Sequence, residues 1–399
     1  MPVTNLKWYQ ADFYQGTRSL GFVAMRFCTH WIGALLHLAV VTRREAQEEL
    51  MDKRGTARKV ASVTARLAGL ATAVCIAIAA SAVMASAAEY SITLLGTLGG
   101  SNSQANSINY SGQAVGWAYT ATGGWHAALF SNGTVTDLGT LPGFSYSMAH
   151  SINRSGRAVG YASISSKDWH AVLFGNGTVT DLGTLPGYTY SLAYGINDSG
   201  QAVGYASSAY GDWHAALFSN GTVTDLGTLG GTYSLADSIN NLGRAVGYAS
   251  TASGNWHAAL FSNGTVTDLG TLGGADSQAN SINDSGVAVG WATTATGLWH
   301  AALFSNGTVT DLGTLGGAKS QANSINNFGV AVGYASTVNG DWHAALFSNG
   351  TVTDLNSLIN PALHWILYNA TGINDAGQII GIGIINGQDR AFLMTPLHD

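Results

Sequence analysis

Residues 105–141 read ANSINYSGQAVGWAYTATGGWHAALFSNGTVTDLGTL, and this stretch decides the fold. Related copies of it recur seven times, about every 43 residues. A fixed period of this size is typical of solenoids and propellers, in which each repeat is one structural unit. The Asp-Leu-Gly-Thr-Leu element marks the period, with full copies beginning at Asp137, Asp181, Asp225, Asp268 and Asp311.

The quoted copy contains four short segments rich in small, β-branched and aromatic residues, separated by turn residues. We therefore expect strands at 105–109, 113–119, 125–130 and 134–141. Asn132-Gly133 suits a type I′ hairpin, because both residues tolerate a positive φ. The repeated Asn-Gly-Thr triplets also match glycosylation sequons, but a two-residue turn explains them without a sugar. Four antiparallel strands per repeat predict a propeller blade.

The two ends of the repeat region complement each other. The last copy, over residues 374–394, has three strands and stops before the fourth. The strand from Tyr90 to Leu98 is a fourth strand with no other three before it. Pairing the two makes seven whole blades and removes an open sheet edge. The predicted fold is therefore all-β, a seven-bladed β-propeller closed by the N-terminal strand and the last blade.

Three segments of each repeat carry a family resemblance: Leu-Gly-Thr-Leu-Gly-Gly, Ile-Asn-x-x-Gly-x-Ala-Val-Gly and His-Ala-x-Leu-Phe. Together they resemble the HAF repeat of extracellular bacterial proteins, over residues 90–394. Six copies read His-Ala-Ala or His-Ala-Val, and the seventh reads Arg390-Ala391-Phe392. The resemblance implies an extracellular location and no established activity, so it assigns no catalytic residues.

A basic and then apolar segment precedes the repeats. Five Lys and Arg residues between 53 and 66 lead into an apolar run at 67–83, which ends in Ala85-Ser86-Ala87. This order predicts a Sec-type signal peptide over residues 51–87. The alternative, a transmembrane anchor, fits poorly because the run is short and rich in alanine. Residues 1–50 are then a mis-start or a cytoplasmic extension, and the propeller covers 88–399. We expect an extracellular or periplasmic monomer with no stable membrane insertion after cleavage.

The propeller region is acidic. It holds six basic residues against Glu89 and sixteen aspartates, a net charge of −11, which argues against nucleic acid as a partner. Both cysteines, Cys28 and Cys75, precede it. Because the propeller region has one Glu, and the sequence shows no nucleophile elbow, phosphate loop or zinc-spaced cluster, a non-enzymatic role is favoured. A hydrolase would need a pair of carboxylates facing the channel, and the candidates are Asp237 with Asp276 or Asp284.

Histidines and aspartates recur with the repeat. The histidine strand lies about 10 Å outward of the innermost strand, so its copies diverge around the ring and do not converge on one metal ion. We expect these histidines and their neighbouring tryptophans to pack and hydrogen-bond between blades, and the aspartates to accept bonds from backbone amides. No cofactor is expected; calcium is the alternative, because turns at Asp198, Asp284 and Asp375 faintly resemble calcium loops. The histidines are His126, His170, His214, His257, His300 and His343.

Function is expected where the copies differ, on the face that carries the loops between blades. Aromatic residues occupy three consecutive inter-blade loops, and one innermost-strand position varies near the channel. Rings beside hydrogen-bonding groups suit a neutral ligand such as a glycan or an extended peptide. The alternatives are a structural extracellular repeat protein, in which the tyrosines only pack the junctions, and thirdly a propeller hydrolase. The predicted ligand-binding residues are Phe144, Tyr146, His150, Tyr188, Tyr190, Tyr194, Tyr233, Asp237 and Trp365.

Overall fold

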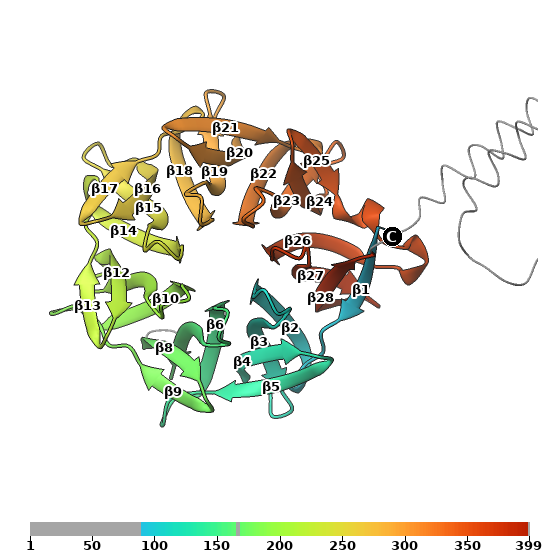
Figure 1. The fold of residues 1–399 in the computed structure, drawn as a ribbon, viewed down its shortest axis with the longest axis horizontal. Coiled ribbons are helices and arrows are strands. Elements are labelled where there is room, and N and C mark those ends of the chain that lie inside the picture. The colour runs from blue at the N-terminus through green and yellow to red at the C-terminus, as the bar shows by residue number, and fades with distance from the viewer. Residues whose placement is uncertain (1–88, 165–167, 398–399) are drawn as a thin grey trace, which may run out of the picture. The chain divides into compact units, whose positions relative to one another are not determined.

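The computed structural model describes residues 89–164 and 168–397, so the predicted signal peptide and the extension before it lie outside the described residues. The described strands form seven four-stranded antiparallel sheets. These sheets stand around a common axis as the blades of a propeller (Figure 1). The predicted seven-bladed β-propeller is confirmed. Within the described ranges, no helix is long and apolar enough to cross a membrane.

Each blade is a meander that runs outward from the axis. Blades 1 to 6 follow the chain from β2 to β25, and blade 7 combines β26, β27 and β28 with β1. Two short 3-10 turns, η1 (Leu355–Leu358) and η2 (Pro361–Leu363), precede β26. The innermost strands are β2 (Gly99–Ile108), β6 (Tyr146–Ile152), β10 (Tyr190–Ile196), β14 (Gly230–Ile239), β18 (Gly273–Ile282), β22 (Gly316–Ile325) and β26 (Ile366–Ile373). The second strands are β3 (Ala114–Thr120), β7 (Ala158–Ser163), β11 (Ala202–Ser207), β15 (Ala245–Thr251), β19 (Ala288–Thr294), β23 (Ala331–Thr337) and β27 (Ile379–Ile385).

The outer half of each blade carries the repeated Trp-His-Ala and Thr-Val-Thr segments. The third strands are β4 (Trp125–Ser131), β8 (Trp169–Gly175), β12 (Trp213–Ser219), β16 (Trp256–Ser262), β20 (Trp299–Ser305), β24 (Trp342–Ser348) and β28 (Gln388–Pro396). The outermost strands are β5 (Thr134–Gly139), β9 (Thr178–Asp181), β13 (Thr222–Asp225), β17 (Thr265–Asp268), β21 (Thr308–Gly313), β25 (Thr351–Asp354) and β1 (Tyr90–Leu94). We call the face with the tight turns inside each blade the turn face. The opposite face, with the loops between second and third strands and between blades, is the loop face.

Every innermost strand contains a β-bulge at the position where the sequence copies differ. In blade 1 the register shifts between Ala105 and Ser107, which leaves Asn106 as the extra residue. The Gln104 carbonyl oxygen then lies over Gly116 of β3, where any Cβ would overlap it. This close approach explains why each second strand has glycine at this point. Because a bulge re-aims its side chain, Asn106 and its counterparts line the central channel.

The hydrophobic core lies between neighbouring blades. Val115 and Ala127 of blade 1, for example, pack with Ile152 and Phe174 of blade 2. Many of the buried residues are alanines, and such small side chains let adjacent sheets approach closely. Each blade therefore needs the next to bury its apolar face.

Two features close the ring. β1 pairs antiparallel with β28, from Tyr90 opposite Pro396 to Leu94 opposite Phe392, and completes blade 7 as predicted. On the turn face, seven asparagine side chains each donate a hydrogen bond to the backbone carbonyl of the next asparagine. The circle runs through Asn109, Asn153, Asn197, Asn240, Asn283, Asn326, Asn374 and back to Asn109.

The repeated histidines pair with aspartates of their own blade. His126 Nδ1 lies 2.8 Å from Asp137 Oδ2, and five other blades repeat the pair. The expectation that histidines hydrogen-bond between blades is wrong in this respect. Asp137 lies opposite Ala128, two residues from His126, so both side chains share one side of the sheet. Blade 7 replaces both partners, with Arg390 and Leu94.

The other repeated polar residues behave largely as predicted. Asp137 Oδ1 accepts a hydrogen bond from the Gly139 backbone N–H at 2.7 Å. Asn132 and Gly133 have φ values of 51° and 74°, as a type I′ turn requires. The turn aspartates considered for calcium accept backbone N–H bonds from the neighbouring blade, as Asp198 does from Arg154. Their carboxylates therefore tie adjacent turns together.

Candidate functional site

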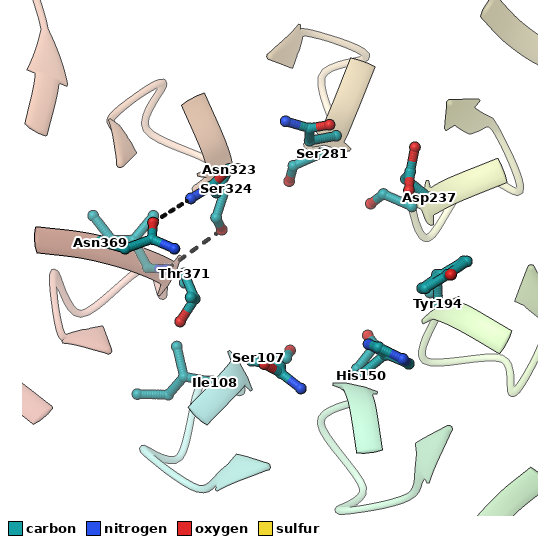
Figure 2. A pocket seen from close by; sticks show the side chains of 17 residues that line it. Ser107, Ile108, His150, Tyr194, Asp237, Ser281, Asn323, Ser324, Asn369 and Thr371 are labelled. Carbon is teal, nitrogen blue, oxygen red and sulfur yellow. Dashed lines mark hydrogen bonds between the residues drawn. The ribbon is translucent and has the colours of Figure 1, made fainter. Parts of the chain in front are cut away.

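The central channel contains a cavity of about 320 Å³, lined largely by the bulge residues and those that follow them (Figure 2). A smaller cavity of about 190 Å³ lies at the turn face, beside the asparagine circle. The channel cavity is where the seven blades differ most in side-chain chemistry, so it is the starting point for a site.

The bulge residues divide the ring into two arcs of consecutive blades. Blades 5, 6, 7 and 1, which we call the amide arc, present Asn280, Asn323, Thr371 and Asn106. Blades 2, 3 and 4, which we call the aromatic arc, present His150, Tyr194 and Asp237. Figure 2 shows these three side chains on one side of the channel and Asn323, Asn369 and Thr371 on the other.

The residue two positions before the bulge follows the same division. It is an amide in the amide arc and an apolar residue in the aromatic arc. Two positions, two residues apart, therefore change together in three consecutive blades. The amide-arc residues are Gln278, Gln321, Asn369 and Gln104, and the aromatic-arc residues are Met148, Leu192 and Leu235.

The amide arc is a hydrogen-bonded scaffold. Asn106 Nδ2 donates to the Ala149 carbonyl of the next blade at 2.8 Å. Asn280 and Asn323 repeat this bond at 2.8 Å, and the Thr371 hydroxyl donates to the Ala105 carbonyl at 2.6 Å. Each bulge residue of this arc thus ties its blade to the next, which explains the residue without any ligand.

The aromatic arc places titratable groups in the channel wall instead. The His150 ring lies 4.7 Å from the Tyr194 ring, and His150 Nε2 is buried with no hydrogen-bond partner in the described part of the chain. Burial lowers the pKa of His150 to about 4, so its imidazole is neutral at pH 7. Burial also raises the pKa of Asp237 to about 7, although a 2.9 Å hydrogen bond from Gln278 opposes the change.

A third cavity, of about 440 Å³, adjoins this arc. Tyr194 lines both this cavity and the channel, so the two are neighbours. Gly211, from the loop between β11 and β12, places it on the loop face, and the adjacent Tyr210 is 96% exposed. We call it the aromatic cavity. Its lining consists of Trp169, Tyr194, Tyr205, Trp213 and Tyr248, with Ser207, Gly211 and Leu235.

Blade 6 shows what the apolar replacements change. There Tyr334 lies opposite Gln321, and its hydroxyl donates to Gln321 Oε1 at 2.9 Å. The counterpart in blade 3, Tyr205, lies opposite Leu192, which offers no acceptor. The aromatic rings persist in both arcs, but in the aromatic arc their hydroxyls are freed from the scaffold amides.

The structure brings only some of the predicted site residues together. His150, Tyr194 and Asp237 meet at the channel. Trp365 belongs to blade 7 and packs against Phe392, outside the aromatic arc. Tyr190 begins β10, opposite Ser207.

The remaining loop aromatics support the inter-blade junctions. Tyr146 and Tyr233 stack on Trp125 and Trp213, each with ring centroids 4.2 Å apart. Phe144 and Tyr188 pack into the clusters between blades. Through its contact with Trp213, Tyr233 supports a wall of the aromatic cavity.

Four aromatic residues of the lining were missed in the sequence: Trp169, Tyr205, Trp213 and Tyr248. They occupy positions that are aromatic in nearly every repeat, so variation between copies does not single them out. The change from Gln to Met or Leu one strand inward is the signal that could have found them. The suggested carboxylate pairs do not share a site. Asp237 lines the channel cavity, Asp284 lines the turn-face cavity, and Asp276 accepts a hydrogen bond from the Trp256 backbone N–H.

No family model and no curated protein matches the sequence. Among solved structures, the chain is similar to TolB from Acinetobacter baumannii (TM-score 0.43, 12% identity, 72% of this chain and 64% of that one). It is also similar to a Mycobacterium tuberculosis puromycin-hydrolyzing peptidase (0.47, 11%, 77% and 54%) and to the β-propeller domain of the Trilobed protease from Pyrococcus furiosus (0.47, 8%, 74% and 96%). The chain thus spans less than two thirds of the first two. At these identities and scores the likeness says nothing about activity or ligand.

Proposed function

We propose that this protein is a secreted, non-enzymatic binding module of the HAF-repeat type, which holds its ligand at the aromatic arc on the loop face. The aromatic cavity is the observation that carries the proposal. Its volume of about 440 Å³ lies within the range of small-ligand sites, and its walls are mostly aromatic, as such sites require.

The position of the cavity supports a functional origin. Three consecutive blades give up the amide side chains that elsewhere join blade to blade, and the buried Asp237 carboxyl accepts its hydrogen bond from a neutral amide, that of Gln278. Departures from the rule that the rest of a fold obeys concentrate at functional sites. A repeat protein under selection for stability alone would gain by keeping Asn at these positions.

The cavity favours one of the two ligand classes expected from the sequence. Apart from its tyrosine hydroxyls and the indole N–H groups of Trp169 and Trp213, Ser207 is the polar side chain in its lining. A sugar ring would leave several hydroxyls unpaired there, and each unmade hydrogen bond costs about 1–3 kcal/mol. An extended peptide that inserts one weakly hydrated side chain fits better, with exposed Tyr210 beside the entrance.

The test is to probe peptide and glycan arrays with the purified protein and three variants. Trp213→Ala removes a cavity wall, and Tyr194→Asn installs the residue that blades 1, 5 and 6 carry. Trp342→Ala, at the equivalent strand position of blade 6, is the matched control. We expect peptide binding that the first two variants reduce at least about ten-fold and the control retains. Binding that survives both cavity variants, or no ligand on either array, contradicts the proposal; a Tyr194-dependent glycan corrects the ligand class.

Secretion has its own test. The signal-like segment supports cleavage after Ala87, so the exported protein should begin at Ala88. Intact-mass measurement of the protein recovered outside the cytoplasm checks this. Retention of the whole chain in the cytoplasm contradicts export by this signal.

A further inference from the structure

The walls of the aromatic cavity share one electrostatic property. Five tyrosine and tryptophan rings surround it, and the described residues that line it include no Lys, Arg or His. The face of such a ring is negative, because of its quadrupole, and attracts cations placed over it. The electron-rich Tyr and Trp make up the whole aromatic lining, without Phe.

Neighbouring rings hold these walls in place. Trp213 stacks on Tyr233 at 4.2 Å, and Tyr248 contacts Trp256 with centroids 4.9 Å apart. Tyr194 stacks with Tyr205 at 6.0 Å. A cavity whose rings are already ordered loses little side-chain entropy when a ligand enters, which favours binding.

Charge around the cavity also favours a cation. Burial is the main cause of the raised pKa of the Tyr194 and Tyr248 phenols. The negative charge of nearby Asp237 raises both pKa values further. The propeller region as a whole carries a net charge of −11. An anionic ligand would therefore meet both the ring faces and this carboxylate unfavourably.

The hydrogen-bond acceptors of the lining narrow the kind of cation, because the side chains that supply them are neutral hydroxyls, with no carboxylate or side-chain amide among the described residues. A primary ammonium group has three N–H donors and is strongly hydrated, so exchanging its water shell for neutral hydroxyls is costly. A trimethylammonium group has no N–H donor, and its charge is spread over methyl groups that can contact the ring faces. Its desolvation cost is correspondingly smaller.

We propose that the aromatic cavity binds a quaternary ammonium group, such as the trimethylammonium head of choline or of a trimethylated lysine. The inference rests on the proposed function, because it names the chemistry of the same site. Tyr194, Tyr205 and Trp213 provide the ring faces, and Asp237 supplies the complementary charge from the channel side.

Titration calorimetry tests it with choline, tetramethylammonium and the neutral isostere of choline in which carbon replaces nitrogen. We expect both cations to bind at least about ten-fold more tightly than the isostere, since a desolvated cation–π contact contributes roughly 2 kcal/mol. Equal binding of the isostere overturns the inference and leaves an apolar binding cavity. Absence of cation binding, with an array ligand that depends on Tyr194, overturns it and preserves the proposed function. Absence of both contradicts the two together.

Variants tie the binding to this cavity. Leu235→Gln introduces the residue that blades 5 and 6 carry at this position, so it suits the fold while placing a polar side chain into the cavity wall. It should weaken choline binding at least about ten-fold, as should Trp213→Ala, while Trp342→Ala leaves it unchanged. Choline affinity that Leu235→Gln leaves intact in a folded variant overturns the assignment.

Two further comparisons identify the molecule that carries the quaternary ammonium group. A peptide with trimethyllysine is compared with its unmethylated form, and phosphatidylcholine vesicles are compared with phosphatidylglycerol vesicles in co-sedimentation. A preference for the methylated peptide identifies a protein ligand, and co-sedimentation with phosphatidylcholine identifies a lipid headgroup. Either result supports the quaternary ammonium chemistry, and indifference in both pairs, without choline binding, overturns it.

Discussion

The amide arc and the aromatic arc have the same backbone and different chemistry. Both carry the same bulge in the innermost strand and the same glycine beside it. In the amide arc the bulge residue donates to the next blade, whereas in the aromatic arc it presents an imidazole, a phenol or a carboxyl to the channel. The amide arc therefore shows what the fold alone requires, and it serves as an internal control for every residue of the aromatic arc.

The largest effect is expected from Asp237→Asn. The folded pKa of Asp237 is about 7, above its ordinary value of 3.8. The neutral carboxyl therefore contributes fully to the free energy of unfolding below pH 4, and this contribution is lost as the pH rises through 7. Asparagine has no charge to bury and can donate to the Ala279 carbonyl, as Asn280 does to Ala322. We expect the variant to match the wild type near pH 4 and to exceed its free energy of unfolding by about 4 kcal/mol at pH 8. Urea unfolding between pH 4 and 8 measures this.

The reciprocal change provides the control. Asn280→Asp places a carboxyl in the amide arc and removes the bond to Ala322, so it should destabilise increasingly as the pH rises. The groups packed near Asp237 are Tyr194, Tyr248 and Gln278, and the two tyrosines titrate only above pH 10. A difference between Asp237→Asn and the wild type that does not change with pH contradicts the account.

His150→Asn should show the opposite pH dependence with a slightly smaller size. The folded pKa of His150 is about 4, below its ordinary value of 6.5. The neutral imidazole therefore contributes fully to the free energy of unfolding above pH 6.5, and this contribution is lost as the pH falls through 4. Relative to the wild type, the variant should gain up to about 3 kcal/mol of unfolding free energy between pH 7 and pH 4. Parallel urea titrations at both pH values check this, and a relative loss on acidification speaks against a buried neutral imidazole.

The fold was predictable because each blade buries the same face against the next. The period, the Asn-Gly turns and the incomplete last copy all follow from that requirement, and the strand at Tyr90 pairs as expected. The partner of His126 was missed, although the two-residue Asn-Gly turn fixes the register of β4 and β5. This register places Asp137 opposite Ala128, two residues from His126 and on the same side of the sheet.

The site was predictable only in part. Comparing copies identified His150, Tyr194 and Asp237, because these residues differ from the scaffold asparagine. The aromatic cavity was missed because its walls recur in most blades, and it adjoins Leu235 at a position where the amide arc carries Gln. The presence of a cavity depends on how side chains of different size and shape pack together in three dimensions. The period of a sequence does not contain that information.

A smaller effect is expected from Asn323→Ala in the amide arc. The variant loses two hydrogen bonds of 2.8 Å, which Asn323 donates to Asn369 Oδ1 and the Ala370 carbonyl, and leaves both acceptors in the channel wall. It also loses the 3.0 Å bond that Asn323 Oδ1 accepts from Gln321 Nε2. Water in the channel can replace part of this, so we expect a loss of about 1–2 kcal/mol in the free energy of unfolding. Choline affinity should not change. A cost within experimental error would show that the amide arc does not hold its blades through these bonds.

The smallest effect on stability, and the most informative, is expected from Tyr194→Asn. The variant gives up the ring contacts of Tyr194 with His150 and Tyr205 and can gain a bond to the Ala236 carbonyl, equivalent to that of Asn106. These changes oppose each other, so the free energy of unfolding should stay within about 1 kcal/mol of the wild type. Thermal and urea unfolding, measured with choline titration on the same samples, separate the two roles. If choline binding is lost and stability is retained, Tyr194 contributes to ligand binding. A loss of several kcal/mol in the free energy of unfolding would instead show that Tyr194 is a core residue and that the aromatic arc has a structural role.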